Sequence, residues 1–146
     1  MLATYVFLAN LLLTGFLTGV IWYVQIVHYP QFADVGETAF RRYHARHSTL
    51  TTYVVAAPMV AELALAVALI FVRPAAMPRP LALAAAALAV FVWIATFFVS
   101  VPLHGRLDQG YDHAVVRRLV RTNWLRTLAW TTRLALLTYA CIRVIG

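Results

Sequence analysis

The chain contains four apolar stretches that are each long enough to cross a lipid bilayer as a helix, and no other feature constrains its fold as strongly. The hydrocarbon core of a bilayer is about 30 Å thick, so a helix needs about 20 mostly apolar residues to cross it. No charged side chain precedes Asp34, and the second and third stretches together hold one charge, Glu62. The four stretches cover residues 2–28, 48–72, 81–104 and 124–145.

The composition favours lipid rather than water as the main surroundings of this chain. Of its 146 residues, 63% are hydrophobic and only 12% are charged, whereas soluble domains carry about 25% charged residues. A soluble protein of this length leaves much of its surface in water and could not bury so many apolar side chains. We therefore expect an all-α fold: an integral membrane four-helix bundle, one domain over residues 1–146, multi-pass in a bacterial inner membrane.

Prolines and turn residues set the expected ends of the helices. Pro30 ends the first helix, and the prolines of "RPAAMPRP" (73–80) separate the second helix from the third. A short basic amphipathic helix at about 113–120 is expected to lie on the membrane surface. Gly15 and Gly19 stand four residues apart, which lets a neighbouring helix approach closely, within one chain or in a homo-oligomer. The expected membrane helices cover about residues 2–28, 40–72, 81–104 and 122–145.

The charge of the chain comes from arginine alone: twelve arginines and no lysine give a formal net charge of +7. In a soluble protein this would suggest nucleic acid, but here the arginines gather at helix ends, where anionic membrane lipids are the simpler partner. Cytoplasmic loops of membrane proteins are enriched in Lys and Arg. The bias between the two sides predicts cytoplasmic loops after the first and third helices and non-cytoplasmic N- and C-termini. Those loops hold Arg41, Arg42, Arg46, Arg106, Arg117, Arg118 and Arg121; the opposite side holds Arg73, Arg79 and Arg143.

Each expected helix carries one polar stripe, and four histidines fall at the same end of these stripes. At 100° per residue the polar side chains of one helix share a face, and polar groups inside a bilayer usually face the bundle interior. His44 and His47 are three residues apart and can reach one metal ion from one helix. His28 and His104 would complete a site for a transition metal such as iron, copper or zinc. Cys141 is the only cysteine, so a site built on several thiolates is excluded.

Two further pairs of polar residues are candidates for binding. Glu62 and Arg133 lie at matching depths in the second and fourth helices. They form a structural ion pair in one interpretation; in the other, Glu62 handles protons or binds substrate. Asn123 and Arg126 share a helix face, where they hold a ligand oxygen or an anionic group, or else cap the fourth helix and bind lipid phosphate. Asn123, Arg126 and Arg133 are therefore the candidate cofactor-binding residues.

Four segments carry a resemblance to known proteins: "IWYVQIVHYPQF", "YHARH", "VPLHGRLDQG" and "TNWLRTLAWTTR". Together they resemble a family of small bacterial four-helix membrane proteins of uncharacterised function. More distantly, the glycine-containing first helix that leads to "HYP" and the Asn-x-x-Arg of the last helix are similar to the membrane anthrone oxygenase-like family. Its fungal members oxidise polyketide anthrones to anthraquinones. This second resemblance implies that His28, Asn123 and Arg126 belong to the site.

Three functions follow as hypotheses. The first, which we favour, is a metal-dependent oxidoreductase or oxygenase-like protein acting on a lipophilic small molecule, with Glu62, Tyr29 and Tyr43 as candidate catalytic groups for proton transfer. The second is a haem b-binding or quinone-linked electron-transfer protein, with two histidines as axial ligands. The third is a non-catalytic membrane assembly subunit, in which the polar stripes serve packing. Nucleic acid is not an expected partner, and no phosphate-binding loop is present.

Overall fold

Helices make up almost the whole molecule. The computed structural model describes residues 1–145 of the chain, helices account for 89% of it, and no strand occurs in the described part. The expected all-α class is therefore confirmed. The elements are α1 (Leu2–Tyr23), η1 (Val24–His28), η2 (Pro30–Asp34), α2 (Glu37–Phe71), α3 (Arg79–Ala95), η3 (Thr96–Ser100), α4 (Val101–Leu107) and α5 (His113–Ile145).

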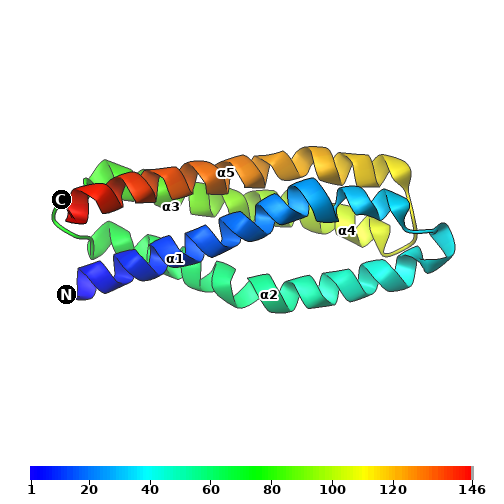
Figure 1. Cartoon of the computed structure of the whole chain (residues 1–146), viewed down its shortest axis with the longest axis horizontal. Coiled ribbons are helices and arrows are strands. Elements are labelled where there is room, and N and C mark those ends of the chain that lie inside the picture. Colours follow the sequence, from blue (N-terminus) through cyan, green and yellow to red (C-terminus); the bar gives the residue numbers. More distant parts are fainter. Residues whose placement is uncertain (146) are drawn as a thin grey trace.

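The helices form one elongated bundle (Figure 1). α1 packs against α2 and α5, and α3 packs against the same two helices, so the four form a closed ring in cross-section. The connection from α2 to α3 lies at the end of the bundle that holds both chain ends. The connections from η1 to α2 and from α4 to α5 lie at the opposite end, which we call the loop end.

Two short π-helical turns interrupt the regular helices near the loop end. η1 continues α1 as far as His28, and η3 joins α3 to α4. A π turn adds one residue to the helical path, which rotates everything after it by about 100°. Pro102, which has no backbone N–H, is the second residue of α4 and lies in its first turn. The faces of residues 24–28 and 101–107 therefore cannot be read from a uniform helical period.

The bounds of the helices differ from expectation in two places. The separate surface helix expected at about 113–120 is instead the first part of α5, which is continuous from His113 to Ile145. Asp112 caps it, because its Oδ1 accepts hydrogen bonds from the backbone N–H of Ala114 (2.8 Å) and Val115 (3.0 Å). In addition, helical structure after α3 extends through η3 and α4 to Leu107.

Three helical segments are long and apolar enough to cross a membrane. They are Leu2–Asp34, Glu37–Phe71 and Arg79–Leu107. The fourth expected membrane helix, α5, is not among them, because arginines lower its hydropathy. Two of these arginines, Arg126 and Arg133, are buried inside the bundle, so the hydropathy of α5 understates how apolar its outer face is.

The bundle is apolar outside and partly polar inside. Leu12, Phe71 and Phe98 are 73%, 75% and 78% exposed. Asn10 and Arg133, by contrast, have no exposed surface. A water-soluble monomer rarely shows large contiguous apolar patches on its surface. This distribution is typical of a chain whose exterior faces lipid.

A buried ion pair joins α2 to α5 in the middle of the bundle. Arg133 Nη1 donates a hydrogen bond to Glu62 Oε1 at 2.7 Å, and both side chains are almost fully buried. Arg133 Nε donates to the carbonyl oxygen of Ala85 in α3 (2.9 Å), and Nη2 donates to Asn10 Oδ1 in α1 (2.8 Å). One guanidinium therefore bonds to all three of the other helices.

The carboxylate of the pair is equally well satisfied. Thr14 Oγ1 donates to Glu62 Oε1 at 3.0 Å, and Trp130 Nε1 lies 3.2 Å from both carboxylate oxygens. Arg133 Nη1 also donates to the hydroxyl of Thr14. Buried charges are tolerated when they are paired and fully hydrogen-bonded. The geometry therefore supports the structural interpretation of Glu62 and Arg133.

We expect Glu62→Gln and Arg133→Gln each to lower the free energy of unfolding by about 3–5 kcal/mol, because each leaves the other charge buried without its partner. The double variant should lose less than the sum of the two single changes. Denaturant unfolding in detergent micelles measures these differences. Arg143→Gln, on the exposed end of α5, is the matched control; an Arg133→Gln protein as stable as that control would contradict the role given to the pair.

Candidate functional site

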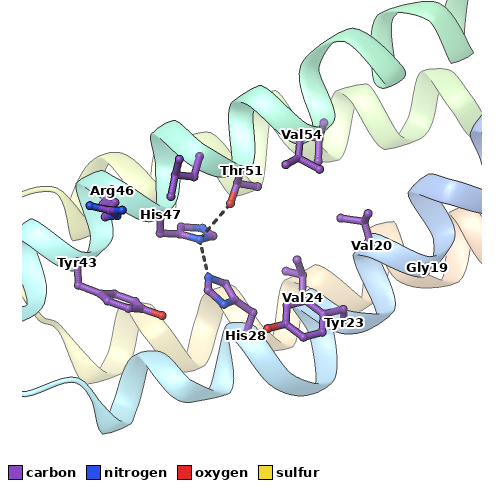
Figure 2. A pocket seen from close by; sticks show the side chains of 12 residues that line it. Gly19, Val20, Tyr23, Val24, His28, Tyr43, Arg46, His47, Thr51 and Val54 are labelled. Carbon is purple, nitrogen blue, oxygen red and sulfur yellow. Dashed lines mark hydrogen bonds between the residues drawn. The ribbon is translucent and has the colours of Figure 1, made fainter.

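A groove of about 570 Å³ lies between α1 and α2 near the loop end. It is lined by side chains from residues 19–28 and 43–55 (Figure 2). Valines and Leu50 line one part, while Tyr43, Arg46, His28 and His47 line the part nearer the loop end. The groove therefore has an apolar section and a polar section, as expected for a site that receives an amphiphilic molecule.

His28 and His47 meet in the polar section of this groove. His28 Nε2 lies 2.6 Å from His47 Nδ1, so one nitrogen donates a hydrogen bond to the other. The hydroxyl of Thr51 is 3.1 Å from the same His47 nitrogen. Figure 2 shows the two rings pointing at each other across the space between α1 and α2. The pair thus places ring nitrogens and one shared proton at the polar section of an otherwise apolar groove.

A second set of hydrogen bonds runs behind this pair, from the surface into the bundle. Asp108 Oδ1 is 2.9 Å from His44 Nδ1, and His44 Nε2 is 2.9 Å from His104 Nδ1. His104 Nε2 is 2.9 Å from the hydroxyl of Tyr29, which Arg126 Nη2 approaches at 3.2 Å. The Asp108 side chain is 53% exposed, whereas that of His44 is fully buried. We call these five residues the polar chain.

The partners at each end of the polar chain fix the direction of its hydrogen bonds. A carboxylate only accepts and a guanidinium only donates. His44 Nδ1–H therefore donates to Asp108, and its Nε2 accepts from His104 Nδ1–H. His104 Nε2 in turn accepts from the hydroxyl of Tyr29, whose oxygen accepts from Arg126. Every bond is made with both imidazoles neutral, so the chain needs no buried imidazolium.

Aromatic packing joins the polar chain to the histidine pair of the groove. The rings of His47 and His104 are stacked with their centroids 5.6 Å apart. Phe32 from η2 is fully buried, and its ring meets His28, His44 and His47 edge-on at 5.5, 5.7 and 5.1 Å. The four histidine rings are therefore held in place by packing as well as by hydrogen bonds.

A small cavity of about 50 Å³ lies next to the groove, deeper in the bundle. Tyr29, Arg126 and Trp130 form part of its wall. Val20, Val24, Thr51 and Val55 line both the cavity and the groove. Through these shared side chains, the groove adjoins the small cavity at the inner end of the polar chain.

Arg126 is held by a network of neutral side chains. Its Nε and Nη2 donate to Asn123 Oδ1 at 3.0 and 2.5 Å. Asn123 Nδ2 donates to Gln25 Oε1 at 2.9 Å, and Gln25 Nε2 donates to the carbonyl oxygen of Val120 at 3.1 Å. Gln25 lies in the π turn η1, so this turn helps to position the guanidinium beside the small cavity.

The side chains expected to form one site lie in two separate parts of the bundle. All four histidines lie within the loop half of the bundle, with Tyr29 and Tyr43 beside them. Asn123 and Arg126 are buried next to them rather than at an entrance. Glu62 and Arg133 instead belong to the mid-bundle ion pair and line neither the groove nor the small cavity.

The arrangement of donors does not match a metal site of three or more ligands. Among residues 1–145, no group of three or more His, Cys, Asp and Glu side chains is arranged to hold one ion. The ring nitrogens meet in two separate pairs, and His44 and His104 already use both nitrogens in the polar chain. Protein zinc sites have three or four protein ligands, so the side chains present do not fit the expected transition metal.

Several parts of the site had no signal in the sequence. Gly19 was expected to pack against a helix, yet a Cβ placed there would meet open space, and Gly19 lines the groove. Nothing in the sequence indicates that Arg46, rather than another arginine of its loop, lines the groove. Phe32 ends the quoted segment "IWYVQIVHYPQF" and Asn10 lies in the first helix, but only the folded bundle places them at the histidines and at the ion pair.

Comparisons with protein-family models, with curated proteins and with solved structures give no match for this chain. The site is therefore interpreted from its own geometry.

We expect protein purified without chelators to carry well under one equivalent of iron, copper or zinc, because no three donors converge. Elemental analysis measures this directly. One equivalent of metal that is lost in a His44→Ala/His104→Ala variant, while the variant still folds, would contradict the interpretation and restore the metal-dependent oxidoreductase.

Proposed function

We propose that this chain is a multi-pass protein of a bacterial inner membrane that takes a lipophilic molecule into the groove between α1 and α2 and acts on its polar end as an oxidoreductase. One observation carries the proposal: an apolar groove of about 570 Å³ leads to the hydrogen-bonded pair of His28 and His47. A groove of this size accommodates a drug-sized or lipid-sized molecule.

Three features support the membrane placement. Three helical segments have the length and hydropathy of membrane spans. The buried positions of Arg126 and Arg133 leave α5 with an apolar outer face, so it completes the bundle as a fourth span. Seven arginines at the loop end, against three at the other, favour a cytoplasmic loop end and non-cytoplasmic termini.

The position of the groove supports a ligand that arrives from the lipid. The groove lies on the side of the bundle, and its lining includes the exposed residues Gly19, Leu50 and Val54. A molecule dissolved in the acyl chains can enter sideways, with its apolar part against α1 and α2. Its polar part then lies toward Arg46 and the histidine pair, nearer the headgroup region at the loop end.

The chemistry of the site is proton transfer coupled to oxidation of the ligand. Histidine is the side chain best suited to donating and accepting protons near neutral pH. His28 Nε2 and His47 Nδ1 share one proton with each other, and opening this hydrogen bond frees a ring nitrogen to exchange a proton with a ligand oxygen. In the oxygenase-like form, O₂ converts a CH₂ group of the ligand to C=O, with one oxygen atom entering the ligand and the other leaving as water. In the electron-transfer form, two electrons and two protons pass from the ligand to a membrane quinone, which becomes a quinol. The resemblance of "HYP" and Asn-x-x-Arg to anthrone oxygenase-like proteins favours the first form.

The haem-binding alternative is less well supported by the histidine pairs. Two nitrogens on opposite sides of one metal, each about 2 Å from it, are about 4 Å apart. The paired nitrogens here are 2.6 and 2.9 Å apart. A visible spectrum of the purified protein distinguishes a haem-binding protein from the oxidoreductase that we propose, since haem b gives an intense absorption band.

Occupancy of the groove can be tested with a photoreactive alkylphenol and protein in lipid nanodiscs. We expect cross-links in the wild type to concentrate on residues 19–28 and 43–55. Gly19→Leu should reduce this labelling by about tenfold or more, because a leucine fills the groove without meeting protein atoms at its Cβ. Peptide mapping by mass spectrometry provides the measurement.

Gly105→Leu is the matched control. Gly105 is also an exposed helical glycine with open space at its Cβ, but it lines neither the groove nor the small cavity. Both substitutions replace glycine by a better helix former, so neither should weaken the fold. Labelling spread evenly over the lipid-facing surface, or equal loss in both variants, would contradict the proposal.

A further inference from the structure

Arg126 is a buried cation without an acidic partner. Its side chain is 8% exposed, and the ion pairs formed by the described side chains do not include it. The chain has five acidic residues. Two of them pair with other arginines, Glu62 with Arg133 and Asp112 with Arg106. Asp108 accepts from neutral His44 at the far end of the polar chain from Arg126, and Asp34 and Glu37 are exposed on the surface.

The hydrogen bonds that Arg126 makes do not neutralise its charge. They go to the amide oxygen of Asn123 and the hydroxyl oxygen of Tyr29, both neutral acceptors. A guanidinium has five N–H donors, and no partner is found for Nη1 among the described residues. Arg133, seven residues further along α5, has a carboxylate partner at 2.7 Å. Because a buried charge is costly without a counter-charge, Arg126 still requires an anionic partner, whereas Arg133 already has one.

The small cavity is where a counter-charge can be placed. Arg126 lines it together with Tyr29 and Trp130, and its volume is about 50 Å³. A cavity of this volume holds a group of a few atoms rather than a whole ligand. It adjoins the groove through the shared residues Val20, Val24, Thr51 and Val55.

We infer that the ligand of the groove is a lipophilic anion. Its tail lies in the apolar section of the groove, and its charged end lies beside Thr51, between the histidine pair and the small cavity, where one anionic oxygen bonds to Arg126. A long-chain carboxylate is the simplest member of this class, and an enolate or phenolate has the same charge on oxygen. The inference rests on the proposed lipophilic groove and adds the charge of its ligand. Arg126 binds the oxygen by charge-assisted hydrogen bonds, while Asn123 and Gln25 position the guanidinium.

The test compares two photoreactive probes that share one alkyl tail, a long-chain carboxylate and the corresponding alcohol, with protein in nanodiscs of neutral lipid. We expect the wild type to prefer the carboxylate by about tenfold or more, since charge-assisted bonds are roughly twice as strong as neutral ones. Arg126→Gln should abolish this preference, so that the carboxylate and the alcohol label the groove to the same extent. Arg126→Lys, which keeps the charge, should retain part of it.

Arg121→Gln is the matched control, because Arg121 lies on the same helix but is exposed. It should keep the full preference for the carboxylate. Equal labelling of the groove by both probes in the wild type would overturn the inference and leave the proposed groove standing. No labelling of the groove by either probe would overturn both. If Arg126→Gln does not fold, as judged by thermal unfolding, the wild-type comparison and Arg126→Lys decide the matter.

Discussion

The ion pair of Glu62 and Arg133 is the interaction on which the rest of this bundle depends. The outer face of the bundle is largely apolar, so polar contacts inside it are the specific interactions that select how the helices are arranged. Arg133 bonds to Glu62, to Asn10 and to the carbonyl of Ala85, and thereby to every neighbouring helix. These bonds fix both the rotation and the height of each helix. The histidines of three different segments meet in the loop half of the same bundle.

The bundle contains two polar centres that differ in how their charges are paired. In the mid-bundle pair, each charged group has its opposite, and both the carboxylate and the guanidinium bond to further polar groups. In the loop half, Arg126 and the histidines are bonded only to neutral groups and to one exposed carboxylate, Asp108. The first centre is complete without a ligand, as a structural element should be. The second leaves donors directed at cavities, which is what binding requires.

Much of the architecture could be predicted from the sequence, because hydropathy and length determine where long helices form. The inward direction of Thr14, His44 and Asn123 also followed from a helical period of 3.6 residues. The details of the site could not be predicted in this way. The π turns change the period just where it mattered, before Tyr29 and within the segment that leads to His104. The groove exists because α1 and α2 diverge beside Gly19, and no local pattern encodes how far two helices stand apart. The expectation of a separate surface helix at about 113–120 was wrong, because residues 113–124 contain nothing that interrupts a helix and α5 runs through them.

The π turn η3 has a consequence for how such a site arises or disappears. It amounts to one residue more than a regular helix needs, placed between the apolar body of α3 and His104. Loss of a single codon there would return the segment to an ordinary helix and rotate the imidazole by about 100° away from its present position. The hydropathy profile would hardly change. Two homologous genes could thus encode bundles of the same outline, of which only one retains its chemistry.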